Sequence, residues 1–73
     1  MRTSIYFFLF IRTCRKYGFT YVLNTYQEMS MILRPNDTFD NITIKTDRGY
    51  VDLFKRAIFL MKDYNWKYSW EDK

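Results

Sequence analysis

The segment from Asp47 to Tyr64 carries the clearest periodic pattern in the chain, and it predicts a long amphipathic helix. Apolar side chains recur there at helical spacing along one wide face. These residues are Tyr50, Val51, Leu53, Phe54, Ala57, Ile58, Leu60, Met61 and Tyr64. Charged residues occupy the opposite face, and Asp47 is a candidate N-cap. A helix with so wide an apolar face needs other parts of the chain to cover it.

One aromatic residue interrupts the polar face of this helix. At about 100° per residue, Phe59 falls among charged side chains rather than on the apolar face. The charged neighbours are Lys55, Arg56 and Lys62. A second element of the fold could cover Phe59, or the ring could be a contact point for a partner, and both interpretations stay open.

The apolar run Ile5–Ile11 predicts a buried central strand, because it is rich in aromatic and β-branched residues. Alternation along a strand places Tyr6, Phe8 and Phe10 on one face. The run is far shorter than the roughly 20 residues of a membrane helix, so we expect no membrane span.

The next segment fits two structures. Apolar residues at i, i+3, i+4, i+7, i+10 and i+14 from Phe19 favour a helix that Pro35 terminates. The alternative makes Phe19–Thr25 a strand that forms a hairpin with the first strand. Further along, Ile42–Thr46 alternates between apolar and polar residues and predicts a short strand.

The final ten residues, YNWKYSWEDK, place Tyr64, Trp66, Tyr68 and Trp70 at every second position. This alternation favours a terminal strand with one aromatic face, whose rings could either complete the core or anchor a partner. If the preceding helix continued instead, Trp66 and Trp70 would align with Phe59 at i+7 and i+11. We therefore expect one compact α+β domain over residues 1–73, in the order β-α-β-α-(β), with two helices on one face of a short sheet.

The composition predicts more apolar surface than such a fold can cover. Of the 73 residues, 48% are hydrophobic and 22% aromatic, which excludes a disordered chain. Two helices cover one face of a sheet, so Tyr6, Phe8 and Phe10 would stay exposed on the other. Because monomers rarely leave such patches open, we expect a homodimer formed through that face.

The net charge of +4 is concentrated in the first half of the chain. Arg12, Arg15 and Lys16 lie in one short stretch that could bind phosphates or an acidic protein surface, or could simply be a solvated turn. Together with Lys67 and base stacking on the C-terminal aromatic residues, this stretch forms an alternative nucleic-acid-binding site.

Side chains with the chemistry of common active sites are scarce. The chain has no histidine, and Cys14 is its one cysteine, so no zinc site of the usual type and no internal disulfide can form. We find no Gly-rich phosphate loop and no nucleophile elbow. We expect no enzyme activity, no catalytic residue, no cofactor and no metal, and a reducing, cytoplasmic compartment.

These observations favour a non-enzymatic protein-binding modulator that occupies a surface of a larger protein or nucleoprotein. Phe59, Trp66 and Trp70 would be its anchors, and Lys55, Arg56 and Lys62 its polar rim. Amino acids with AT-rich codons dominate the composition, which suggests a phage- or virus-type inhibitor acting in the host cytoplasm. A nucleic-acid-binding protein and a structural homo-oligomer are the alternatives.

Overall fold

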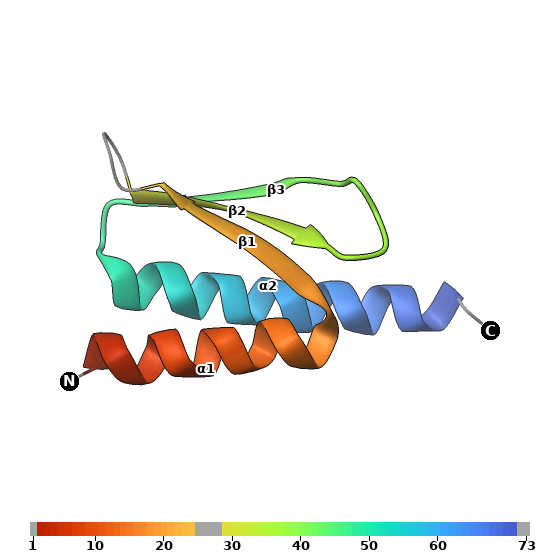
Figure 1. Ribbon diagram of the computed structural model, residues 1–73, viewed down its shortest axis with the longest axis horizontal. Coiled ribbons are helices and arrows are strands. Elements are labelled where there is room, and N and C mark those ends of the chain that lie inside the picture. Colours follow the sequence, from red (N-terminus) through yellow and green to blue (C-terminus); the bar gives the residue numbers. More distant parts are fainter. Residues whose placement is uncertain (1, 25–28, 72–73) are drawn as a thin grey trace.

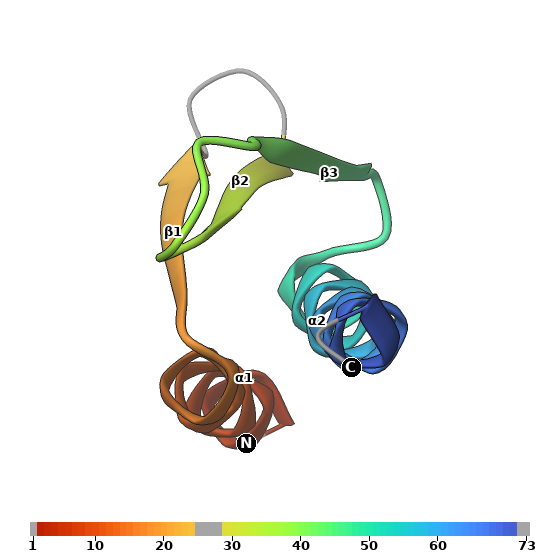
Figure 2. The same ribbon diagram turned by 90° about the vertical axis from the view of Figure 1, so that its right-hand side faces the viewer.

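The computed structural model describes residues 2–24 and 29–71, and of residues 67–71 it describes the backbone alone. Its elements are α1 (Arg2–Tyr17), β1 (Phe19–Asn24), β2 (Met29–Pro35), β3 (Ile42–Thr46) and α2 (Tyr50–Glu71). The strands form an antiparallel sheet in the order β1-β2-β3. Both helices lie on one face of that sheet and run in the same direction (Figures 1 and 2). The α+β class is confirmed, but the predicted order of elements is wrong.

The first element is a helix, so the strand predicted over Ile5–Ile11 is wrong. Phe10 and Cys14 are buried one turn apart, and half-buried Tyr6 lies on the same face one turn earlier. Phe8, by contrast, is 68% exposed. The preference of aromatic and β-branched residues for strands is weak, and here the packing of one helical face outweighs it.

Gly18 ends α1. Its φ of +73° lies in the left-handed region, which glycine adopts without a steric penalty at the residue after a helix. Arg15 and Lys16 lie in the last turn, where positive charge interacts favourably with the helix dipole. The Asn36 backbone N–H donates to the Gly18 carbonyl at 2.8 Å, which ties this turn to the end of β2.

A β-hairpin replaces the helix expected from Phe19 onward. Tyr21 pairs with Leu33 and Leu23 with Met31, and all four side chains point toward the helices. Val22, which the helical pattern would bury, is 61% exposed. The alternative of a strand beginning at Phe19 is therefore right, although its partner is β2 and not the first apolar run.

The second half of the chain follows the sequence pattern more closely. β3 spans the predicted residues, and the predicted apolar face of α2 packs against the sheet and α1. The Leu53 backbone N–H donates to the Gly49 carbonyl at 3.1 Å, so Gly49 and not Asp47 is the N-cap. The predicted terminal strand is wrong, because α2 continues to Glu71.

An aromatic cluster joins the two helices to the sheet. The rings of Phe10 and Phe54 stack with centroids 5.4 Å apart, and the edge of Tyr21 meets Phe10 at 4.9 Å. At the other end of the core, Phe19 and Tyr64 form an edge contact at 5.5 Å. The largest fully buried side chains are Phe10, Met31, Leu33, Leu53 and Met61.

Two phenylalanines of α1 test the helical assignment. We expect Phe10→Ala to lower the free energy of unfolding by about 3–5 kcal/mol, because the ring is fully buried. Phe8→Ala should change it by less than about 0.5 kcal/mol, because that ring is exposed. Urea unfolding followed by circular dichroism measures both values. On a strand the two side chains would share a face, so equal losses would contradict the helix.

Candidate functional site

The continuous helix α2 aligns four exposed side chains along its outer face. Lys55, Phe59, Lys62 and Trp66 recur at i, i+4, i+7 and i+11, and we call them the α2 stripe. Phe59 is 77% exposed and Trp66 is 62% exposed. Trp66 therefore aligns with Phe59, as the alternative of a continued helix implies, and not as on the favoured terminal strand. The side chain of Trp70 lies outside the described residues.

Phe59 separates two hollows on the surface. The first, which we call the interhelical groove, lies between α1 and α2 and has a volume of about 390 Å³. Its lining residues are Tyr6, Leu9, Thr13, Lys55, Ile58, Phe59 and Lys62. The second hollow, of about 480 Å³, is lined by α2 alone, through Lys55, Arg56, Phe59, Leu60 and Asp63.

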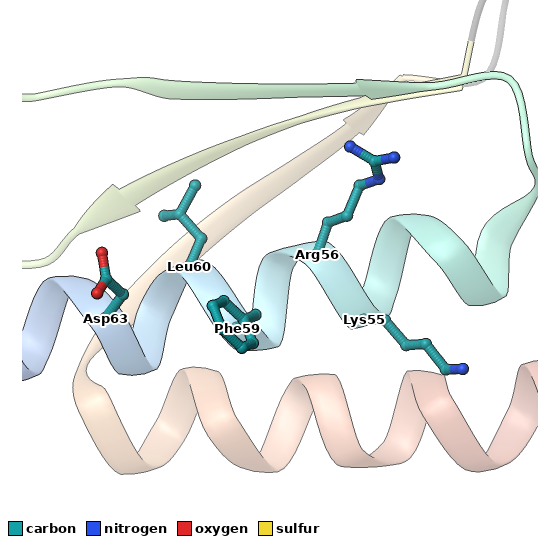
Figure 3. Close-up of a pocket in the computed structure, with 5 residues that line it drawn as sticks. All are labelled: Lys55, Arg56, Phe59, Leu60 and Asp63. Carbon is teal, nitrogen blue, oxygen red and sulfur yellow. The ribbon is translucent and has the colours of Figure 1, made fainter.

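The side chains around Phe59 point in different directions. Figure 3 shows Arg56 and Leu60 directed toward the sheet and Lys55 directed toward α1. The Lys55 ammonium lies 5.0 Å from the centroid of the Tyr6 ring, within the range of a cation–π interaction. This contact crosses from one helix to the other and places a positive charge at the groove.

Arg56 is part of the start of α2 as well as of the predicted rim. Its Nε donates to Asp52 Oδ2 at 2.7 Å, and the Thr46 hydroxyl donates to the same oxygen at 2.6 Å. The Thr46 hydrogen bond, followed by that from Arg56, lowers the pKa of Asp52. Lys55 and Lys62 therefore remain as the exposed cations of the α2 stripe that line the groove.

The predicted basic patch lies on the second half of α1. Arg12, Arg15 and Lys16 are exposed there, and the Lys16 ammonium lies 5.4 Å from the centroid of the Tyr17 ring. Two of these three residues occupy the last helical turn, where the helix dipole favours cations for structural reasons alone. The side chain of Lys67, the fourth predicted member, lies outside the described residues.

The three residues expected at a dimer interface do not share a surface. Phe10 is fully buried in the core, so it cannot contact a second copy in this fold. Tyr6 is half-buried in the interhelical groove, while Phe8 is exposed. The exposed residues on the open face of the sheet are instead a mixed polar and aliphatic set: Thr20, Val22, Asn24, Ile32, Arg34, Thr43 and Lys45.

Sequence reasoning missed several exposed apolar side chains, of which Leu9 and Phe39 bear on the site. Leu9, 39% exposed, lines the groove from α1, and Phe39, 91% exposed, lies in the loop between β2 and β3. Leu9 could be placed only by assigning α1 as a helix. The signal for Phe39 was an aromatic residue within a polar turn, flanked by Asp37 and Asp40.

Cys14 packs in the core, and its thiol is poorly suited to nucleophilic chemistry. Burial raises its pKa from 9.0 to about 11, so the thiol stays protonated near neutral pH. Among residues 2–24 and 29–71, no three potential ligands gather into a metal site. In the same part of the chain, no helix has the length and apolar character that crossing a bilayer requires.

A comparison of the chain with protein-family models, with curated proteins and with solved structures finds no match.

Because the Cys14 thiol is buried, the free energy of unfolding should decrease at alkaline pH. Between pH 9 and 11 an unfolded chain releases the Cys14 proton while the folded chain retains it, so stability falls as the pH rises. Two pKa units correspond to a loss of about 2–3 kcal/mol. In urea unfolding at pH 8 to 11, wild type should lose that much more stability than Cys14→Ala. Parallel curves for the two proteins would contradict the raised pKa.

Proposed function

We propose that this protein is a non-enzymatic modulator that binds a larger protein through the α2 stripe. The observation that carries the proposal is Phe59, a ring 77% exposed on an ordered helix between two hollows. Interface cores are enriched in aromatic residues, phenylalanine among them. A ring on an ordered helix also loses little conformational freedom on binding. Trp66 supplies a second anchor two turns further along α2.

The charge around these anchors supports a protein partner with an acidic rim. Lys55 and Lys62 flank Phe59, and each lines the interhelical groove. Charged residues at the edge of an interface mainly guide association and specificity, while desolvated aromatic residues supply most of the affinity. The partner would present an apolar pocket for Phe59 with carboxylates around it.

Blocking a surface of the partner is the mode of action that this small fold favours. The described residues hold no metal cluster, and the single thiol is buried, so chemistry on a substrate has little support. The composition adds the suggestion of a phage- or virus-type inhibitor of host machinery. Nucleic-acid binding through α1 has less support, because the helix dipole already accounts for two of its exposed cations.

Affinity capture from extracts of the native host tests this proposal. We expect Phe59→Ser to reduce recovery of the partner at least tenfold, since truncating a hot spot costs about 2 kcal/mol or more. Phe8→Ser is the matched control, because that ring is also exposed but lies on α1 outside both hollows. Quantitative mass spectrometry of the captured proteins measures the difference.

Two results would contradict the proposal. One is recovery of the same captured proteins in the same amounts by Phe59→Ser and by Phe8→Ser, when both variants have the circular dichroism spectrum of wild type. The other is capture of nucleic acid whose retention falls by several orders of magnitude between about 50 and 200 mM salt, as phosphate contacts require. An aromatic-anchored protein contact should weaken far less over this range.

A further inference from the structure

The loop between β2 and β3 holds an aromatic ring in solvent. Phe39 is 91% exposed, the highest value among the exposed large hydrophobic side chains that the structure describes. Hydrogen bonds order the backbone on both sides of the ring. The Thr38 N–H donates to the Pro35 carbonyl at 3.2 Å, and the Asp40 N–H donates to the Thr38 hydroxyl at 3.3 Å. An ordered loop loses little conformational freedom when its ring is bound.

The sequence neighbours of this ring are acidic. Asp37 and Asp40 flank Phe39 and are both exposed. Residues 36–44 contain no lysine or arginine, so this part of the chain carries a charge of −2. We call residues 36–41 the acidic loop.

The interhelical groove has the complementary chemistry. Leu9 and Ile58 give it an apolar lining beside Phe59, and Lys55 and Lys62 give it positive charge. Its volume of about 390 Å³ exceeds the roughly 150 Å³ of a cavity that holds a benzene ring. An aromatic side chain flanked by carboxylates therefore matches the groove in size, polarity and charge.

A chain cannot place its own acidic loop in its own groove. The loop joins β2 to β3 at the sheet (Figure 1). The groove is lined by residues of α1 and α2. The Asn36 hydrogen bond to Gly18 holds the start of the loop at the junction of α1 and β1. No residue of the loop lines the groove.

We propose that the acidic loop of one copy occupies the interhelical groove of a second copy. The Phe39 ring packs against Phe59 of that copy, and Asp37 and Asp40 lie beside its groove lysines. The contact joins two different surfaces, so it repeats head to tail and yields either a closed ring or an open chain. A symmetric pairing of two grooves would instead bring like charges together, which is unfavourable.

This assembly needs only the protein itself and does not depend on the proposed function. Both nevertheless use Phe59, so a subunit whose groove holds a neighbour's loop cannot bind the larger partner at the same time. Phe39→Ser leaves the groove intact and should retain partner capture. The two proposals can therefore fail separately.

Sedimentation velocity on the purified protein tests the assembly in about 50 mM salt, from about 10 µM to about 1 mM protein. The average mass of wild type should rise with concentration. Phe39→Ser, which lacks the anchor of the loop, and Lys55→Glu/Lys62→Glu, which reverses the charge of the groove, should each stay monomeric. Mixed together, they should form a 1:1 dimer that grows no further, because one intact loop meets one intact groove.

Three further measurements complete the test. Phe8→Ser should assemble like wild type, and about 0.5 M salt should weaken assembly by screening exposed charges. A single fourfold variant, Asp37→Lys/Asp40→Lys/Lys55→Glu/Lys62→Glu, should assemble with itself, since both its loop and its groove have reversed charges and neither wild-type surface is present. Circular dichroism confirms that each variant is folded. A monomeric wild type at about 1 mM, assembly that survives Phe39→Ser, or a mixture of the first two variants that stays monomeric would each overturn the proposal.

Discussion

The stack of Phe10 on Phe54 is the contact on which the rest of the structure depends. It joins α1 to α2, and the edge-to-face contact between Tyr21 and Phe10 ties α1 to the sheet. A chain of this length buries only about 60–65% of its unfolded surface, so a few large side chains must hold both helices. With Phe10 turned inward, Leu9 comes to lie at the groove and Phe8 in solvent. The position of the groove thus follows from the packing of the core.

A helix or strand could be predicted wherever its residues follow either the helical or the strand pattern of apolar residues, and not both. β3 meets that condition over its whole length and α2 meets it as far as Tyr64, and both lie there where the sequence pattern places them, whereas the alternation of the last residues hid the continuation of α2 to Glu71. The run Ile5–Ile11 does not meet that condition, because seven consecutive apolar residues fit a buried strand and a packed helix equally well. The deciding signal lay outside the run, in Arg15, Lys16 and Gly18, which together form a helix C-terminus. From Phe19 onward, apolar residues happen to recur at helical spacing, although the alternating pattern of a strand is the one that the fold follows.

The candidate site was predictable to a smaller extent than the fold. Phe59 could be identified because an aromatic residue on the polar face of a secure helix is conspicuous, and it is exposed. The position of Trp66 depended on where α2 ends, which the alternation of the last residues obscured. Leu9 required the correct assignment of α1, and Phe39 lies in a loop where no periodicity indicates which side chains face solvent. Loop residues on the surface do not alternate between buried and exposed positions, so their sequence carries no periodic pattern from which exposure could be predicted.

The number of strands has a consequence for the surface between the helices. Each antiparallel strand reverses the chain, so three strands between α1 and α2 leave the second helix pointing the same way as the first (Figure 1). With an even number of strands, α2 would run antiparallel to α1. Lys62 would then lie near Tyr6, and Lys55 near Thr13. Which residues of α1 face which residues of α2 across the groove therefore depends on whether the number of intervening strands is odd or even. The sequence of either helix alone does not determine this.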